Sequence, residues 1–81
     1  MLKLTLVSRS YCHLCDEMDS ALEAMRGEVA TFSFEVLDID THPELLALYD
    51  ELVPVLLHGK VELCHYFLDT AKVRDYLGEI G

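Results

Sequence analysis

Cys12 and Cys15 are the residues of this 81-residue chain whose type and spacing most directly indicate chemistry. They stand three positions apart at the head of a segment with helical spacing, so one helical turn brings their sulfurs to the same side. The unpaired amides at a helix start favour a thiolate, which predicts a lowered pKa for Cys12. A thiolate attacks disulfides, and Cys15, closer to the interior, can attack the mixed disulfide formed at Cys12. The pair therefore indicates thiol–disulfide exchange.

Charged neighbours are expected to shift the pKa of Cys12 in opposite directions. Arg9, in the preceding loop, and His13, when protonated, favour the thiolate. The carboxylates at positions 16, 17 and 19 oppose it. We therefore expect a pKa for Cys12 that is depressed but not extreme.

The residues alone leave two other interpretations of the pair open. In the first, Cys12 and Cys15 are two thiols at a helix start that have only a structural role. With Cys64 and His65 they would also supply the four ligands of a zinc site. Cys64 is expected on a hairpin, however, where a buried thiol behaves as a small hydrophobic side chain. Redox chemistry is therefore the prediction, and no metal is expected.

Composition narrows the class of protein. A chain of this length, with 52% hydrophobic residues, indicates one domain over residues 1–81. The net charge of −9 argues against nucleic acid or an anionic membrane as a partner, and we expect a monomer. No apolar run is long enough to span a bilayer. Three cysteines, an odd number, and no signal-peptide pattern at the start indicate a reducing compartment, the cytoplasm.

Hydrophobic periodicity predicts the elements that position the cysteines. Residues 2–7 alternate like a strand, and helical spacing begins at residue 12 and reaches Gly27, the expected left-handed end of that helix. Residues 32–39 predict a second strand. Thr41, Pro43 and Glu44 then predict a capping box and a short helix, whose leucines and tyrosine over 45–52 are assigned to the core.

The second half of the chain predicts a hairpin and a last helix. A strand over 54–58 begins with proline, a turn follows, and residues 61–67 form its partner. Asp69 and Thr70 cap the helix. Its inner face is expected to carry Val73, Tyr76, Leu77 and Ile80. The order β-α-β-α-β-β-α predicts an α/β fold: a mixed four-stranded sheet with helices on both faces and a right-handed crossover between its parallel strands.

This arrangement resembles the glutaredoxin branch of the thioredoxin-like superfamily over nearly the whole chain, and most of all its short bacterial glutaredoxin-like proteins. The residues that carry the resemblance are Tyr11-Cys12-His13-Leu14-Cys15 and Val53-Pro54-Val55. It implies a thioredoxin-like fold, with Cys12 as the nucleophile and Cys15 as the resolving thiol. It further implies a cis Pro54, backbone groups of Val53 that bind an extended substrate, and Tyr11 flanking the site.

The chain departs from typical glutaredoxins in two places. His13 stands where a proline usually follows the first cysteine, and the stretch from Cys64 to Asp69 lacks the Gly-Gly turn that helps to hold glutathione. Asp69 is the remaining candidate, because the helix N-terminus that it caps can receive a glutathione carboxylate. The resemblance thus supports the fold and the redox pair more firmly than it supports glutathione as a partner.

The sequence accordingly predicts a thiol–disulfide oxidoreductase without a bound cofactor. Its substrate is expected to be a protein disulfide or a glutathione mixed disulfide, and glutathione or a reductase regenerates it. One alternative is a non-catalytic binding module that holds a peptide beside Val53 and Pro54. Another is a carrier of a metal or of a [2Fe–2S] cluster shared by a dimer, an arrangement that usually goes with a single active-site cysteine.

Overall fold

Four strands form one mixed sheet, in the order β2-β1-β3-β4, in the computed structural model, which describes residues 2–28 and 32–80. The elements in chain order are β1 (Leu2–Ser8), α1 (His13–Glu28), β2 (Phe32–Asp38), the 3₁₀ turn η1 (Ile39–Thr41), α2 (Pro43–Tyr49), β3 (Val55–His58), β4 (Val61–His65) and α3 (Thr70–Ile80). β1 runs parallel to β2, and β3 is antiparallel to both β1 and β4. The predicted order of elements and the α/β class are confirmed.

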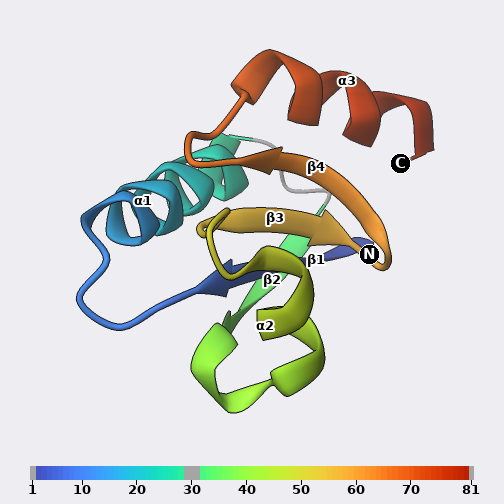
Figure 1. The fold of residues 1–81 in the computed structure, drawn as a ribbon. Coiled ribbons are helices and arrows are strands. Elements are labelled where there is room, and N and C mark those ends of the chain that lie inside the picture. Colours follow the sequence, from blue (N-terminus) through green and yellow to red (C-terminus); the bar gives the residue numbers. More distant parts are fainter. Residues whose placement is uncertain (1, 29–31, 81) are drawn as a thin grey trace.

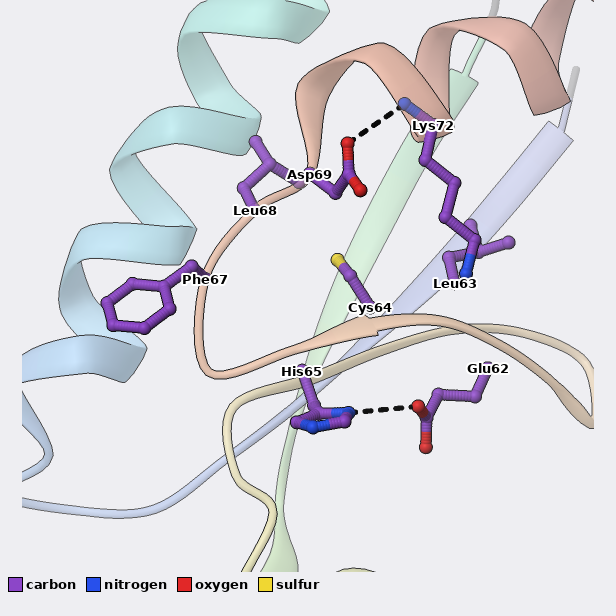
Figure 2. Close-up of a pocket in the computed structure, with 8 residues that line it drawn as sticks. All are labelled: Glu62, Leu63, Cys64, His65, Phe67, Leu68, Asp69 and Lys72. Atoms are coloured by element: carbon purple, nitrogen blue, oxygen red, sulfur yellow. Dashed lines mark hydrogen bonds and ion pairs between the residues drawn. The ribbon is translucent and has the colours of Figure 1, made fainter.

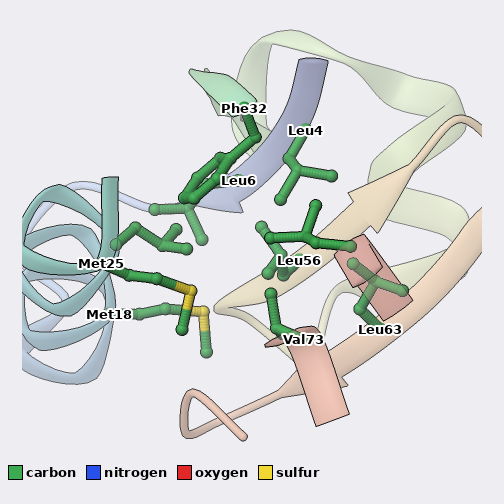
Figure 3. Packing of buried hydrophobic residues seen from close by; sticks show 10 residues of the cluster. Leu4, Leu6, Met18, Met25, Phe32, Leu56, Leu63 and Val73 are labelled. Carbon is green, nitrogen blue, oxygen red and sulfur yellow. The ribbon is translucent and has the colours of Figure 1, made fainter. Parts of the chain in front are cut away.

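Helices cover both faces of this sheet (Figure 1). On one face α1 and α3 contribute to a buried cluster, which Figure 3 shows. Its members are Leu4, Leu6, Met18, Leu22, Met25, Phe32, Leu56, Leu63, Val73 and Leu77. On the other face α2 and Ile39 of η1 pack against Val7, Val55 and Leu57. The central strands β1 and β3 send side chains to both clusters, as the two-residue period of a strand requires.

The cysteine-bearing helix α1 is held by one apolar face. Cys15, Met18, Leu22 and Met25 recur every three or four residues and are all buried. Gly27 lies inside α1, which continues to Glu28, so the predicted left-handed helix end is wrong. The packed face outweighs the weak helix propensity of a single glycine, which costs about 1 kcal/mol relative to alanine.

The start of α2 corrects a second expectation. Thr41 Oγ1 donates to the carbonyl of Asp38 over 2.9 Å instead of capping α2, and α2 begins after His42 without any side-chain cap. The carboxylate of Asp38 accepts from the amide of Asp40, so it is the η1 turn that is capped. The predicted capping box is therefore wrong. Leu48 of this helix is 66% exposed and does not belong to the core as expected.

The hairpin and the last helix agree better with the sequence. Gly59 turns the hairpin with φ +61°, a conformation that glycine adopts without a steric penalty. Asp69 caps α3 by accepting from the amide of Lys72 over 3.1 Å. β4 ends at His65, two residues earlier than expected, and η1 takes the last position of the second predicted strand. The side chain of Ile80 lies outside the described residues.

No helix in residues 2–28 and 32–80 is both long and apolar enough to cross a membrane.

Candidate active site

One edge of the sheet gathers the segments that the sequence singled out. Ser8, at the carboxyl end of β1, lies beside Asp38 of β2. Val7 pairs with Val55 at the start of β3, and Val55 pairs with His65 at the end of β4. The cysteine loop after β1, the proline segment before β3 and the loop after β4 therefore meet at this edge.

Cys12 caps α1 and Cys15 lies in its first turn, with the predicted geometry. Their Cα atoms are 5.2 Å apart and their Sγ atoms lie at disulfide-bonding distance. The amide of Cys15 donates to Cys12 Sγ over 3.2 Å, so Cys12 caps the helix with its sulfur. Such a contact favours negative charge on that sulfur when the pair is reduced. Cys12 is partly exposed, whereas Cys15 is 2% exposed.

Arg9 links the loop that follows β1 to η1 and to the end of α2. Its guanidinium pairs with Asp40 over 3.3 Å and with Asp50 over 2.5 Å, and it also donates to the backbone carbonyl of Asp50. Hydrogen bonds to Asp50 and then to Asp40 raise the pKa of Arg9. Its charge is thus matched by two carboxylates, and no hydrogen bond joins it to Cys12 within the described part of the chain.

His13, the other predicted tuning residue, points along α1. Its Nε2 lies 3.1 Å from Oε1 of Glu17, four residues on, and its side chain is 86% exposed. A protonated His13 therefore has a carboxylate partner that shares its charge. Its influence on Cys12 stays a prediction.

The segment that precedes β3 exposes backbone groups at the same edge. The Val53–Pro54 peptide bond is cis, as the resemblance implied. The carbonyl of Pro54 accepts from the amide of Tyr66 over 2.9 Å, and the Tyr66 hydroxyl donates to the carbonyl of Glu51 over 2.8 Å. Among residues 2–28 and 32–80 the amide and the carbonyl of Val53 have no hydrogen-bond partner, which leaves both open to a ligand.

Two exposed aromatic side chains lie on the loops that meet at this edge of the sheet. Tyr11, immediately before Cys12, is fully exposed with φ +59°, and Phe67, after β4, is 67% exposed. Between α1 and this loop lies a shallow groove of about 260 Å³. Its lining residues are Leu14, Glu17, Met18, Ala21, Tyr66, Phe67, Leu68 and Thr70. Sequence reasoning missed Tyr66 and Phe67 as site residues because they were assigned to a strand; two adjacent aromatics before a helix cap were the available signal.

A second cavity, of about 350 Å³, lies on the other side of the same loop and contains Cys64 (Figure 2). Burial raises the pKa of the Cys64 thiol, and a hydrogen bond from the Asp69 backbone partly offsets this effect. The predicted substrate-binding residue Asp69 lines this cavity, and its carboxylate already accepts from an amide of α3. Asp69 does not line the groove beside the cysteines.

The zinc site considered from the sequence does not form. Cys64 and His65 are consecutive residues of a strand, and their side chains point to opposite faces of β4 in Figure 2. In the part of the chain that the structure describes, no three His, Cys, Asp or Glu side chains gather as metal ligands.

Comparison with known families agrees with this geometry. Residues 3–78 match the profile of the family described as Glutaredoxin-like domain (DUF836). The chain belongs to this family. The match covers every strand except the first residue of β1, and it spans all three helices apart from the last two residues of α3. The expected glutaredoxin-like membership is confirmed.

Solved structures place this glutaredoxin-like domain in the thioredoxin-like fold. Protein Ne2328 from Nitrosomonas europaea is 40% identical with a TM-score of 0.82, over 93% of this chain and 89% of that one. A protein from X. campestris is 31% identical with a TM-score of 0.62, over 96% and 99%. Fasciola hepatica thioredoxin, at 19% identity and a TM-score of 0.63 over 99% and 81%, shares the fold. No curated protein matched significantly.

Proposed function

We propose that this glutaredoxin-like protein is a thiol–disulfide oxidoreductase that reduces protein disulfides or glutathione mixed disulfides. The observation that carries the proposal is the asymmetry of the cysteine pair. Cys12 is partly exposed and receives an amide hydrogen bond at a helix start, while Cys15, at bonding distance, is buried. An accessible sulfur suits attack on a substrate, and a buried one suits attack only on its neighbour.

The reaction proceeds in two exchanges. The Cys12 thiolate attacks one sulfur of the substrate disulfide, forms a mixed disulfide and releases the other sulfur as a thiolate, which takes up a proton. Cys15, after losing its proton, attacks Cys12 Sγ and releases the second substrate thiol. Two electrons pass from the dithiol to the substrate, and the pair ends as the Cys12–Cys15 disulfide. A thiol donor, glutathione or a dithiol reductase, then restores the reduced pair.

The surrounding residues have supporting roles in this proposal. The free amide and carbonyl of Val53 hydrogen-bond an extended substrate segment beside cis-Pro54, and Tyr11 flanks that segment. Arg9 and His13 favour the Cys12 thiolate, and the helix start at Asp69 receives a carboxylate of glutathione where glutathione is the substrate. No bound cofactor takes part. We further propose a monomer working in the cytoplasm, where a free thiol such as Cys64 persists.

Single-turnover chemistry tests the proposal. The pre-reduced protein is expected to release thiols from insulin and from hydroxyethyl disulfide. Cys12→Ser reduces this to background, because it removes the attacking sulfur. Cys15→Ser still attacks but accumulates a mixed disulfide that mass spectrometry detects. Cys64→Ser is the matched control and keeps wild-type rates. If the wild-type protein releases no thiol from either substrate, the proposed activity is wrong.

A further inference from the structure

We propose, on the basis of the proposed function, that the substrate at this edge of the sheet is a disulfide in a positively charged polypeptide segment, in preference to glutathione. The shape of the groove, the distribution of charge and the exposed aromatic side chains support this choice independently of one another.

The groove beside the cysteines has a shape that can accommodate the side chains of a bound peptide. It begins at Leu14, within the Cys12–Cys15 turn, and runs along α1 against the loop after β4. Its volume of about 260 Å³ is below the range of about 300–1,000 Å³ that encloses small ligands. A shallow apolar groove next to free backbone groups at Val53 therefore fits the successive side chains of an extended chain.

The charges around the groove are almost all negative. Glu17 lines it and lies 3.1 Å from His13, so its charge is balanced only where His13 is protonated, and Asp16 follows Cys15 in the sequence. Glu51 lies at the same edge, since its carbonyl holds the Tyr66 hydroxyl. Arg9 is the arginine of this edge, and it is occupied by two carboxylates. A ligand that brings positive charge is attracted here, whereas the carboxylates of glutathione are repelled.

The other cations of the chain lie elsewhere. Lys3 pairs with Glu35 at the far end of β1, and Lys60 sits in the turn between β3 and β4, at the opposite edge. Arg26 and Arg74 pair with Glu23 and Glu28. Lys72 lines the Cys64 cavity, and Figure 2 shows it at the opposite end from Phe67, which lies against α1. No unpaired lysine or arginine in residues 2–28 and 32–80 thus lines the groove.

Aromatic faces complete the match to a cationic chain. Tyr11 precedes Cys12, Phe67 lines the groove together with Leu14, and both rings are largely exposed. Lysine and arginine side chains stack on such faces. The segment is held while Cys12 attacks its disulfide, and the two electrons come from the reduced Cys12–Cys15 pair.

Two synthetic peptide disulfides, identical except for three lysines or three glutamates beside the cysteine, test this inference. Glutathione disulfide and neutral hydroxyethyl disulfide complete the set. Single-turnover rates of the dithiothreitol-reduced and desalted protein are divided by the rates with dithiothreitol alone, which removes intrinsic differences in reactivity. We expect the lysine peptide to react about tenfold or more faster than the glutamate peptide at 20 mM salt, within the range of electrostatic steering. The ratio of the two peptide rates should fall at 200 mM salt. Glutathione disulfide should react more slowly than the lysine peptide.

Matched charge variants locate the effect. Glu17→Gln removes a carboxylate from the groove and should lower the preference for lysine. Glu79→Gln removes an equivalent exposed carboxylate near the end of α3 and should leave the preference unchanged. Equal rates for both peptides, faster reaction with glutathione disulfide, or equal effects of the two variants would overturn the inference. Failure to reduce hydroxyethyl disulfide as well would instead overturn the proposed oxidoreductase activity.

Discussion

The three cysteines differ in what surrounds their sulfurs. Cys12 has an amide donor and access to solvent, Cys15 is buried one turn later, and Cys64 sits half-buried in a strand. The three thiols are thus expected to differ in reactivity because their positions in the fold differ. Spacing in the sequence distinguishes the first two from the third, but only the fold shows that Cys64 is separated from them.

Cys64 is predicted to react more slowly than Cys12 in the reduced protein. Because burial raises its pKa, its thiolate fraction at pH 7.5 is below the value of about 10% for a free cysteine. Iodoacetamide reacts with the thiolate, so at pH 7.5 it should modify Cys12 first and Cys64 much later. The rate at Cys64 should rise only as the pH approaches and passes the raised pKa. Peptide mapping by mass spectrometry follows each site.

Unfolding provides the control for this measurement. In urea the raised pKa is lost, and Cys64 should react like an ordinary thiol. The folded state holds the thiol proton more tightly, so this group lowers the free energy of unfolding above the free-thiol pKa of about 8.5. Modification of Cys64 as fast as Cys12 in the folded protein would contradict the assigned environment.

Between elements, Tyr66 joins two loops of the site by hydrogen bonds. Its amide bonds to Pro54 and its hydroxyl to Glu51, so the loop after β4 holds the proline segment before β3. Tyr66 adopts φ +65°, an unfavourable conformation for a residue with a Cβ atom. The site therefore keeps a strained backbone position where the two loops meet.

Tyr66→Phe is predicted to lower the free energy of unfolding by about 0.5–1.5 kcal/mol, the usual net value of one hydrogen bond. It leaves the backbone and the ring in place and removes only the bond to Glu51. Urea denaturation measures the change. Tyr49→Phe is the matched control, because within the described residues the Tyr49 hydroxyl has no hydrogen-bond partner, and it should change stability little. An equal loss in both variants would show that the Glu51 contact contributes nothing.

The sequence was informative where local periodicity decides the structure. Alternation in β1 and the recurrence of Met18, Leu22 and Met25 predicted the sheet and α1 correctly. The capping box failed because Asp38 and Thr41 satisfy the η1 turn first. Local competition of this kind depends on where the strand ends, which periodicity does not fix.

The contacts that assemble the site were beyond sequence reasoning. Arg9 meets Asp40 and Asp50 across 31 and 41 residues, and Tyr66 meets Glu51 across 15. No local pattern encodes such pairs, because they depend on how the loops converge at the sheet edge. The cysteine pair could be predicted since both of its partners lie on one helical turn.

At the scale of the whole molecule, the net charge of −9 is spread over a body measuring 31 × 23 × 18 Å. The Debye length is about 30 Å at 0.01 M salt and about 8 Å at 0.15 M. At low salt every carboxylate therefore repels the others across the molecule, whereas at 0.15 M it interacts only with its neighbours. Self-repulsion destabilises the compact state, so screening should stabilise it.

The midpoint of thermal unfolding is predicted to rise by several degrees between 0.01 and 0.15 M NaCl, since 1 kcal/mol corresponds to about 4–8 °C in a domain of this size. The exposed ion pairs, such as Lys3 with Glu35, oppose this trend, but pairs of this kind contribute at most about 1 kcal/mol each. Glu79→Lys, which changes the net charge by two units away from these pairs, should unfold at a higher temperature in low salt and respond less to added salt. A midpoint that falls with salt would mean that the ion pairs outweigh the repulsion, and the excess of carboxylates would then play no part in limiting stability.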